Sequence, residues 1–246
     1  MNTEILWSVD DHVNPITGIA GVTDVVAATY NTIYLLKHAA MLFIVSDNDA
    51  AKRALKLFPD SALVGESTEP GLMFFSTNSP VAISKVNWTG KTVIQKTNNG
   101  TVAVAETIAR GADPVFGFHW ANIETVADWL IKRKEQRSKI NEVKTRIKDS
   151  ITLIASGGRE QVFSHVQGRL LEDWYCCQAL KKLIEGKKVN YKKYFELSRK
   201  SIMQQYPHGD PSDETKELVL KANTLPGIIP VFKQAGEGIY KVENAI

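Results

Sequence analysis

Five short polar segments follow apolar, strand-like runs of the chain, at the places where a parallel-sheet protein has its loops. Three of them contribute carboxylates, and the other two contribute hydroxyl and amide side chains. Carboxylates can hold a divalent cation, and a glycine turn at a helix start can hold an anion. These are the parts that a phosphate-ester hydrolase requires. The segments are Thr23–Thr29, Gly65–Glu66, Thr77–Pro80, Thr97–Thr101 and Leu171–Asp173.

The segment around Gly100 has the composition of an anion-binding loop. Residues 98–101, Asn-Asn-Gly-Thr, stand between an apolar strand and an alanine-rich run. A glycine permits a left-handed turn, after which the free N–H groups of the next helix point at the loop. An Asn-Gly hairpin turn is the alternative. The run that follows reads as a helix, so we favour the loop-to-helix arrangement. Lys96 adds a cation beside it.

Acidic residues on three segments could share one metal ion. Asp24 ends the first long apolar strand, where it is as well suited to cap the next helix as to bind a ligand. Glu66 has the same position after the run Ala62–Val64. Glu172 and Asp173 are neighbours on a predicted helix, where side chains diverge by about 100°, so only one can readily face a site. Mg²⁺ prefers oxygen ligands of this kind.

Other chemistries have less support in the residue pattern. No closely spaced histidines or cysteines suggest zinc, and His119 and His165 stand apart, as ordinary histidines do. Ser79 and Ser156 are candidate nucleophiles, but no paired His–Asp constellation supports them. The Ser-Gly-Gly-Arg run that begins at Ser156 instead predicts a second strand-end loop, in which Arg159 offers a cation to an anion.

Apolar runs that alternate between strand and helix periodicity must position these residues. The alternation predicts one α/β domain over residues 1–246, with helices on both faces of a mainly parallel sheet. The predicted strands are Ile16–Val26, Leu42–Val45, Ala62–Val64, Ala82–Val86, Thr92–Gln95, Pro114–Phe118, Ile151–Ala155, Ile228–Phe232 and Gly238–Val242. The predicted helices are Ala28–Ala39, Asp49–Leu57 with Asp47 as its cap, Val102–Ala109, one that Asn122 caps, Val166–Ile184, Tyr191–Gln205 and Asp213–Ala222.

A charged stretch at residues 132–148 is expected to extend a helix into solvent. It holds eight Lys or Arg against two Glu, which would also suit a nucleic-acid patch, but no aromatic residues interleave for base stacking. The whole chain has a formal net charge of +3, which is too small to indicate a nucleic-acid partner. We therefore expect a solvated helix.

The composition indicates a cytoplasmic protein without membrane association. The first twelve residues are acidic and lack the apolar stretch of a signal peptide. The best apolar run, Ala39–Val45, is too short to cross a bilayer. Cys176 and Cys177 are neighbours whose side chains diverge on a helix, so we expect two reduced, buried thiols. The sequence leaves a homo-oligomer open.

Taken together, the five segments resemble the 2-phosphosulfolactate phosphatase family of coenzyme M biosynthesis. That family carries, in order, D-V-x-R-A-T-T, G-G-E-R, G-N-S-P and T-N-G-T segments and an E-D pair on a late helix. The corresponding residues here are 24–29 (D-V-V-A-A-T), 64–67 (V-G-E-S), 77–80 (T-N-S-P), 97–101 (T-N-N-G-T) and 172–173. Residues 117–122 resemble a further G-S-x-x-N segment, and residues 226–240 resemble the family's closing segment. The likeness covers nearly the whole chain.

The resemblance implies a three-layer α/β/α fold with a mainly parallel or mixed sheet. It also implies a Mg²⁺-dependent phosphate monoesterase that converts 2-phosphosulfolactate to sulfolactate and phosphate. Three acids would be both the catalytic residues and the metal ligands, namely Asp24, Glu66 and Asp173. The substrate-binding residues would be Asn78, Ser79, Lys96, Thr97, Asn99, Gly100 and Thr101, with Arg159 as a further cation.

Two positions depart from the family pattern. Ala27 replaces the arginine of the first segment, and Ser67 replaces the arginine after the family's glutamate. A hydrogen bond to a charged group contributes about 1.5–3 kcal/mol, so the loss of two lowers transition-state binding by roughly 10²–10⁴-fold. Lys96, Arg159 and Arg169 are the candidates to compensate. The alternative to a phosphatase is a non-catalytic relative that binds a small anion or a protein partner.

Overall fold

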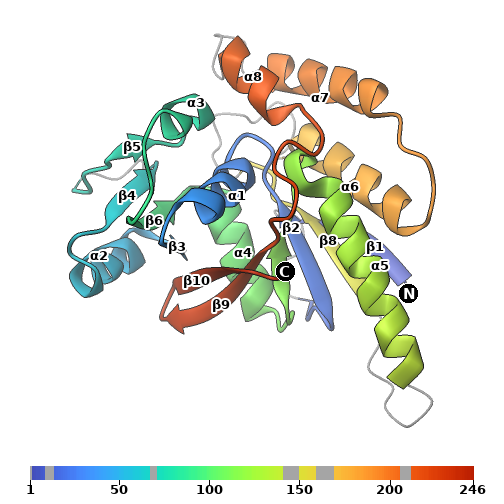
Figure 1. Ribbon diagram of the computed structural model, residues 1–246, viewed down its shortest axis with the longest axis horizontal. Helices are drawn as coiled ribbons and strands as arrows, with labels where there is room; N and C mark the ends of the chain where they lie inside the picture. Colours follow the sequence, from blue (N-terminus) through green and yellow to red (C-terminus); the bar gives the residue numbers. More distant parts are fainter. Residues whose placement is uncertain (1, 9–13, 67–70, 141–149, 159–168, 206–211) are drawn as a thin grey trace.

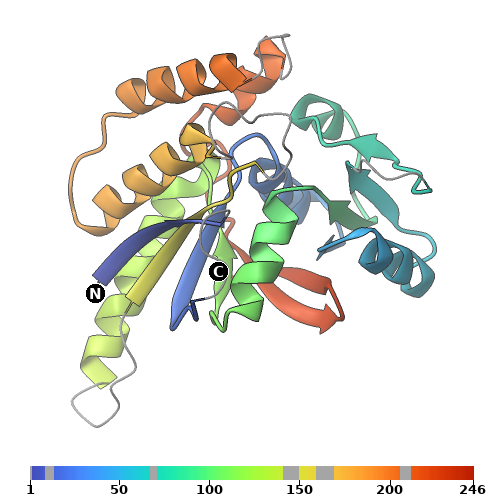
Figure 2. The same cartoon turned by 180° about the vertical axis from the view of Figure 1, so that it is seen from behind.

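One ten-stranded sheet, with helices on both faces, organises the chain (Figures 1 and 2). The structure is a computed structural model that describes residues 2–8, 14–66, 71–158 without 141–149, 169–205 and 212–246. The predicted α/β fold class is confirmed. The strands, in their order across the sheet, are β1 (Asn2–Trp7), β8 (Ser150–Ala155), β2 (Ile19–Thr23), β7 (Val115–Gly117), β9 (Pro230–Gly236), β10 (Ile239–Asn244), β3 (Met41–Val45), β6 (Thr92–Lys96), β4 (Ala62–Gly65) and β5 (Ser76–Thr77).

The sheet is mixed and consists of two parallel blocks joined by an antiparallel hairpin. The first block is β1, β8, β2 and β7, and the second block is β3, β6, β4 and β5. The hairpin β9–β10 pairs antiparallel with β7 on one side and with β3 on the other. The two blocks therefore run in opposite directions, and in a flat sheet their carboxyl ends would lie at opposite edges.

Twist brings those ends together. Neighbouring strands rotate by about 20–25°, so the five steps from β2 to β6 add up to roughly 100–125°. The two blocks consequently lie on opposite sides of the hairpin with their strands at a steep angle to each other (Figure 2). The loops after β2 and after β6 can meet as a result.

The helices begin where the local sequence supplies a start signal. Asp47 caps the second helix, as predicted, by accepting a hydrogen bond of 2.7 Å from the N–H of Ala50. Ser212 does the same for the last helix. The helices are α1 (Ala28–His38), α2 (Asn48–Leu57), α3 (Pro80–Ser84), α4 (Gly100–Ala109), α5 (Ile123–Ile140), α6 (Leu171–Ile184), α7 (Tyr191–Gln205) and α8 (Asp213–Val219), with a 3₁₀ turn η1 (Trp120–Asn122) before α5.

Three predictions of local structure are wrong. The expected strand Ala82–Val86 belongs instead to helix α3, because Ser79 caps that turn and Pro80 suits a first helical position. The predicted cap Asn122 lies inside η1, where its side chain accepts from the backbone N–H of His119, the actual cap. The helix expected from Val166 begins only at Leu171; residues 166–168 lie outside the described residues.

Strand β1 was not predicted, since residues 2–4 are polar and residues 5–7 are apolar, without the alternation of a half-buried strand. It is an edge strand, and edge strands need only one apolar face. Its residues pair with β8, and Trp7 stacks on Trp174 of α6 with ring centroids 5.0 Å apart. The charged stretch forms the second half of α5 up to Ile140, with Lys132 and Lys134 exposed, which agrees with a solvated helix; residues 141–149 lie outside the described part.

Alternate residues of the central strands face two separate cores. Ile19 of β2 packs with Ile151 and Leu153 of β8 beneath α5 and α6. Ala20 and Val22 face the opposite way, toward α4. This period-2 pattern is what a strand covered on both faces requires. Among the described residues, no helix has the length and apolar character needed to span a membrane.

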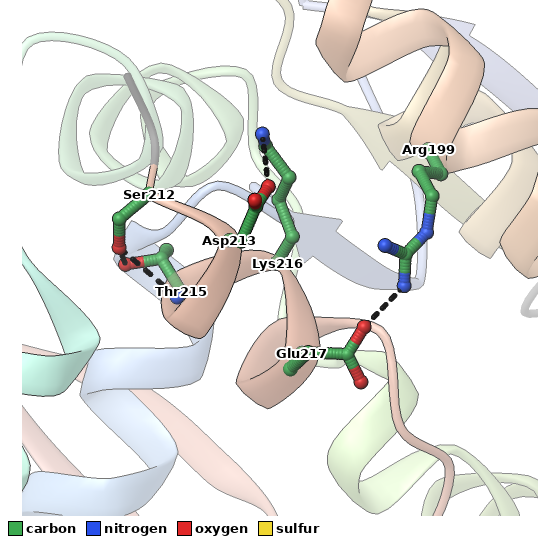
Figure 3. A network of polar contacts seen from close by, with 6 residues as sticks. All are labelled: Arg199, Ser212, Asp213, Thr215, Lys216 and Glu217. Atoms are coloured by element: carbon green, nitrogen blue, oxygen red, sulfur yellow. Dashed lines mark hydrogen bonds and ion pairs between the residues drawn. The ribbon is translucent and has the colours of Figure 1, made fainter. Parts of the chain in front are cut away.

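A polar network attaches α8 to α7 at the top of the molecule as drawn in Figure 1. Arg199 of α7 contacts Glu217 of α8 at 2.5 Å, and Lys216 pairs with Asp213 one turn away at 2.9 Å (Figure 3). The Arg199–Glu217 pair is exposed on both sides, so it adds little to stability. It links α7 to α8, whose Val219 joins the core under α5 and α6, whereas the pair of the buried Lys216 with the exposed Asp213 lies within α8.

The Gly65→Ala substitution tests how closely β4 and β6 approach at the site edge. Gly65 has a φ of +124°, and a methyl group there would lie 1.8 Å from the carbonyl oxygen of Lys96. We expect a loss of more than about 3 kcal/mol in the free energy of unfolding, measured by urea denaturation. Gly90→Ala is the matched control, because Gly90 also has a positive φ of +75° but an open environment; it should lose only about 1–2 kcal/mol. Equal losses in both variants would contradict the close approach.

Candidate functional site

Asp24 closes the loop that leads from β2 into α1. Its backbone N–H donates to the hydroxyl of Thr29 at 2.9 Å, and its carbonyl accepts from the N–H of Thr29 at 3.1 Å. Its Oδ1 accepts from the N–H of Ala28 at 3.3 Å. The Asp24 carboxylate thus accepts from the first N–H group of α1, although the N-cap residue of that helix is Ala27. The partner residue Thr29 is a member of the same sequence segment.

The second oxygen of Asp24 lies against the start of α4. A methyl group on Gly100 would lie 2.9 Å from Oδ2 of Asp24 and 2.6 Å from Cβ of Ala28. The backbone N–H of Gly100 is close enough to the Asp24 carboxylate to moderate the rise in its pKa. Gly100 is therefore required for close approach and not for a left-handed turn, since its φ is not positive. The expected loop-to-helix arrangement is confirmed, because α4 starts at Gly100.

Thr97 and Thr101 fix the shape of the loop between β6 and α4. The N–H of Thr97 donates to the hydroxyl of Thr101, and the N–H of Thr101 donates to the hydroxyl of Thr97, both at 3.1 Å. Both side chains are buried. Their hydroxyls are thus engaged within the loop, while Asn99 precedes the first residue of α4. Their predicted contact with substrate stays a prediction.

Glu66 reaches the same loop from β4. Its Oε1 accepts from the N–H of Asn98 at 3.3 Å, and its own N–H donates to the carbonyl of Lys96 at 2.9 Å. The buried Lys96 in turn donates to Oδ1 of Asn98 at 2.6 Å. Glu66 is half-buried. It is the acid of the site that solvent reaches most easily.

Asp173 and Glu172 approach the site from the first turn of α6. Asp173 accepts at Oδ1 from the N–H of Val25 at 2.7 Å and at Oδ2 from the N–H of Gly157 at 3.1 Å. Glu172 accepts at Oε2 from the hydroxyl of Ser201 on α7 at 2.7 Å. Both acids are buried. Asp173 is therefore the member of the pair that faces the Asp24 loop, and it ties that loop to the loop after β8.

Burial and the charges of neighbouring acids raise the affinity of Asp24 and Asp173 for protons. Burial, and then the charges of Glu66 and Glu172, raise the pKa of Asp24 to about 7. Burial, and then the charges of Asp24 and Glu172, raise the pKa of Asp173 well above its usual range. A protonated carboxyl or a bound cation relieves this charge. Perturbed carboxyls grouped in this way are typical of functional sites.

The remaining residues that the sequence predicted for the site have different positions in the structure. Asn78 is linked to α1, because both its carbonyl and its side-chain oxygen accept from Nδ2 of Asn31, at 2.8 and 2.9 Å. The hydroxyl of Ser79 is engaged as the cap of α3. Ala27 is buried at 3% exposure. Arg159, together with Ser67 and His165, lies outside the described residues.

His119 is a buried support of the Asp24 loop, a role that no pattern in the sequence indicates. Its Nε2 lies 3.2 Å from the carbonyl of Val25, and its Nδ1 accepts from the N–H of Ala121 at 3.1 Å. Burial lowers the pKa of His119 to about 3. The ring is therefore neutral, with the proton on Nε2 donated to Val25. This agrees with the expectation of an ordinary core histidine.

Two cavities among the described residues have none of the four acids in their linings. A void of about 10 Å³, the size of one water molecule, lies under Gly100 and Thr29. A cavity of about 440 Å³ lies elsewhere, with Trp129, Arg133 and Lys233 among its lining residues and none of the predicted site residues. Within the described ranges, no three His, Cys, Asp or Glu side chains are arranged to hold a metal ion by themselves.

Comparison with known proteins supports the resemblance seen in the sequence. The family model described as 2-phosphosulpholactate phosphatase matches residues 8–224. The chain belongs to this family. A curated relative from Bacillus subtilis (strain 168), the "Probable 2-phosphosulfolactate phosphatase", is 28% identical over 152 residues, which are 61% of this chain and 57% of that protein. The chain therefore matches little more than half the length of this relative. All the described acids of the site fall inside the family match.

The raised pKa of Asp24 predicts how the free energy of unfolding depends on pH when EDTA keeps metal ions away from the protein. The pKa is about 7 in the folded chain, whereas an ordinary aspartate in the unfolded chain has a pKa of 3.8, so the folded form holds the extra proton between these values. The contribution of Asp24 to stability is complete below pH 3.8 and is lost as the pH rises to 7. The free energy of unfolding of Asp24→Asn, relative to wild type, should therefore increase by about 1.4 kcal/mol per pH unit over this window.

Urea denaturation at several pH values measures this difference. Glu243→Gln is the control: bonds to Lys233 and Lys241 lower the pKa of Glu243 to about 2, so its carboxyl is ionised in both states above pH 5. That variant should follow wild type between pH 5 and 7. Parallel curves for Asp24→Asn and wild type would contradict the raised pKa.

Proposed function

We propose that this protein is a Mg²⁺-dependent phosphate monoesterase that acts on a small anionic phosphoester, with 2-phosphosulfolactate as the candidate substrate. The main supporting observation is the meeting of Asp24 from the first block and Glu66 from the second block on one loop at the start of α4. Membership in the 2-phosphosulpholactate phosphatase family supports the same reaction class. A cytoplasmic location and a role in coenzyme M biosynthesis are parts of this proposal.

The donor atoms of the site suit magnesium. Asp24 and Glu66 offer hard oxygen ligands, and the charges that raise the pKa of Asp24 come from other acids. Mg²⁺ commonly uses one or two carboxylates and completes its shell with water and phosphate oxygens. The described residues contain no group of three side chains that could hold a metal ion, and a magnesium site with two carboxylate ligands does not need one. We assign Asp24 and Glu66 as the residues that would hold the ion.

Asp173 has a different task in this proposal from the ligand role expected from the sequence. Both its oxygens accept backbone N–H groups, from Val25 and Gly157. It would keep the Asp24 loop in place while a ligand binds. When bound, Mg²⁺ would neutralise the phosphoryl oxygens and lower the pKa of a water molecule for attack.

Lys96 is the described cation that stands beside the loop, and it would help to balance the charge of the substrate. Its ammonium group is held by Asn98, so it is oriented toward the loop. Asn78, which α1 holds through Asn31, would contribute an amide. Arg159 remains a candidate cation from the sequence. We keep Ser79, Thr97, Asn99, Gly100 and Thr101 as proposed neighbours of the substrate.

The alternative is a relative that binds a small anion or a protein partner without turnover. The burial of Ala27 favours it, since that position leaves little room for a cation near the substrate. The retained acids, Asp24 and Glu66, oppose it. A homo-oligomer is compatible with either function.

Phosphate release from a panel of small phosphomonoesters, with 2-phosphosulfolactate among them, tests the proposal. We expect turnover in Mg²⁺ and none in EDTA. Asp24→Asn should lower kcat/KM by roughly 10²–10⁴-fold, because it removes a charged ligand worth several kcal/mol in the transition state.

Asp49→Asn is the matched control for the aspartate. Asp49 is an exposed residue of α2, where it pairs with Lys52, so the variant should keep wild-type turnover. Absence of turnover for the whole panel in Mg²⁺, by folded protein, would favour the relative that only binds.

A further inference from the structure

A central strand of the second block carries a buried amide where its neighbours carry apolar side chains. Gln95 of β6 lies in register with Ile44 of β3 and Val64 of β4, and both of these belong to the apolar core on the α4 side of the sheet. Gln95 itself has no exposed surface. Burying an amide costs free energy unless it regains its hydrogen bonds, so the partners of Gln95 indicate what the residue does.

Both ends of the Gln95 amide bind the start of α1. Its Nε2 donates to the carbonyl oxygen of Ala28 at 2.9 Å, and its Oε1 accepts from the hydroxyl of Thr32 at 2.7 Å. The Thr32 hydroxyl also lies 2.9 Å from the same Ala28 carbonyl. Because a carbonyl can only accept, the amide nitrogen must face Ala28, and the orientation of the amide is fixed. We call these two side chains the Gln95–Thr32 clamp.

Ala28 connects the clamp to the site. Its carbonyl belongs to the clamp, while its N–H donates to Oδ1 of Asp24 at 3.3 Å. Its Cβ also fills the space beside Gly100, only 2.6 Å from the place of a methyl group on that residue. A displacement of Ala28 would therefore move a donor of the Asp24 carboxylate and change the approach of α1 to α4.

Apolar packing leaves a gap beside this contact. The void of about 10 Å³ described above has Ala28, Thr32 and Gly100 in its lining. Side chains that do not fill the space between two helices do not fix their separation. Hydrogen bonds are directional and have a narrow range of lengths, so the clamp can fix the position of α1 where packing does not.

We infer that Gln95 and Thr32 are positioning residues, which hold the start of α1 against β6 and thereby set the place of the Asp24 carboxylate relative to Gly100. The inference rests on the proposed function only for the metal ion that Asp24 would hold. The two side chains act through Ala28, so they support the site without entering it.

Hydrogen exchange of single backbone amides tests the clamp without turnover. Gln95→Met removes both hydrogen-bonding groups and keeps the length of the side chain, and Thr32→Val removes the hydroxyl. In each variant, the Ala28 amide should exchange at least about 10-fold faster, relative to the Leu153 amide of β8, than it does in wild type, because the start of α1 can then open locally. Side chains that add only to global stability would change both amides equally.

Thr107→Val is the matched control. Thr107 is buried on α4, and its hydroxyl donates at 2.7 Å to the carbonyl of Ala103, four residues earlier in the same helix. It thus copies the bond of Thr32 to Ala28 without a strand as second partner. This variant should keep the ratio of Ala28 to Leu153 exchange within about 3-fold of wild type. Thr32→Ser, which keeps the hydroxyl, should do the same.

The phosphatase assay shows whether the clamp acts on the proposed metal ligand. Gln95→Met and Thr32→Val should each raise the Mg²⁺ concentration for half-maximal rate at least about 5-fold, the effect of one ordinary hydrogen bond. At saturating Mg²⁺, kcat should stay within about 3-fold of wild type, because neither side chain contacts the substrate in this proposal. Thr107→Val should leave both quantities unchanged.

Three results would overturn the inference: an unchanged exchange ratio in Thr32→Val, an equal change of that ratio in Thr107→Val, or an unchanged Mg²⁺ requirement in variants with an altered ratio. Thr32→Val is the smaller change, so it decides the test if Gln95→Met does not fold. An altered ratio in a protein without turnover would overturn the proposed enzyme and keep the clamp, whereas turnover with unaltered ratios would do the reverse.

Discussion

The contact between the Asp24 carboxylate and the backbone of Gly100 is the constraint on which the site depends. Asp24 follows β2 in one parallel block, and Gly100 follows β6 in the other block, which runs the opposite way. No side chain larger than hydrogen fits at position 100, because Ala28 and Asp24 fill that space. The twist of the sheet, the hairpin β9–β10 and the absence of a side chain at Gly100 are all needed to bring the two strand ends into contact.

Burial of several acids in one place is costly, and the fold offsets part of that cost with backbone donors. Asp24 lies at the starts of α1 and α4, and Asp173 lies in the first turn of α6. The positive ends of helix dipoles favour carboxylates by about 0.3–1 kcal/mol each. The raised pKa values of Asp24 and Asp173 show that this compensation is incomplete. The two carboxyls therefore remain under electrostatic strain, which protonation or, in the proposed function, a bound cation would relieve.

Much of this arrangement could be predicted from local sequence. The strand-to-loop position of Asp24 and the loop-to-helix position of Gly100 follow from apolar periodicity, which reports burial. The meeting of Asp24 with Gly100 could not be predicted in this way. It depends on the pairing of β10 with β3, about 195 residues apart in the chain, and such pairing leaves no local pattern. The role of His119 could not be predicted for the same reason, since its hydrogen-bond partner Val25 lies 94 positions away in the chain. The role of Asp173 as a tie depends on the loop after β8.

The position of the hairpin has a consequence for biosynthesis. β9 and β10 are the fifth and sixth strands across the sheet, yet they are the last strands in the chain. A ribosome therefore completes both parallel blocks before it supplies the strands that join them. Until then, the edges of β7 and β3 that β9 and β10 will cover stay unpaired and can pair with other chains. The acids would meet only after residues 230–244 have left the exit tunnel, so the site cannot form while only the two parallel blocks have been synthesised.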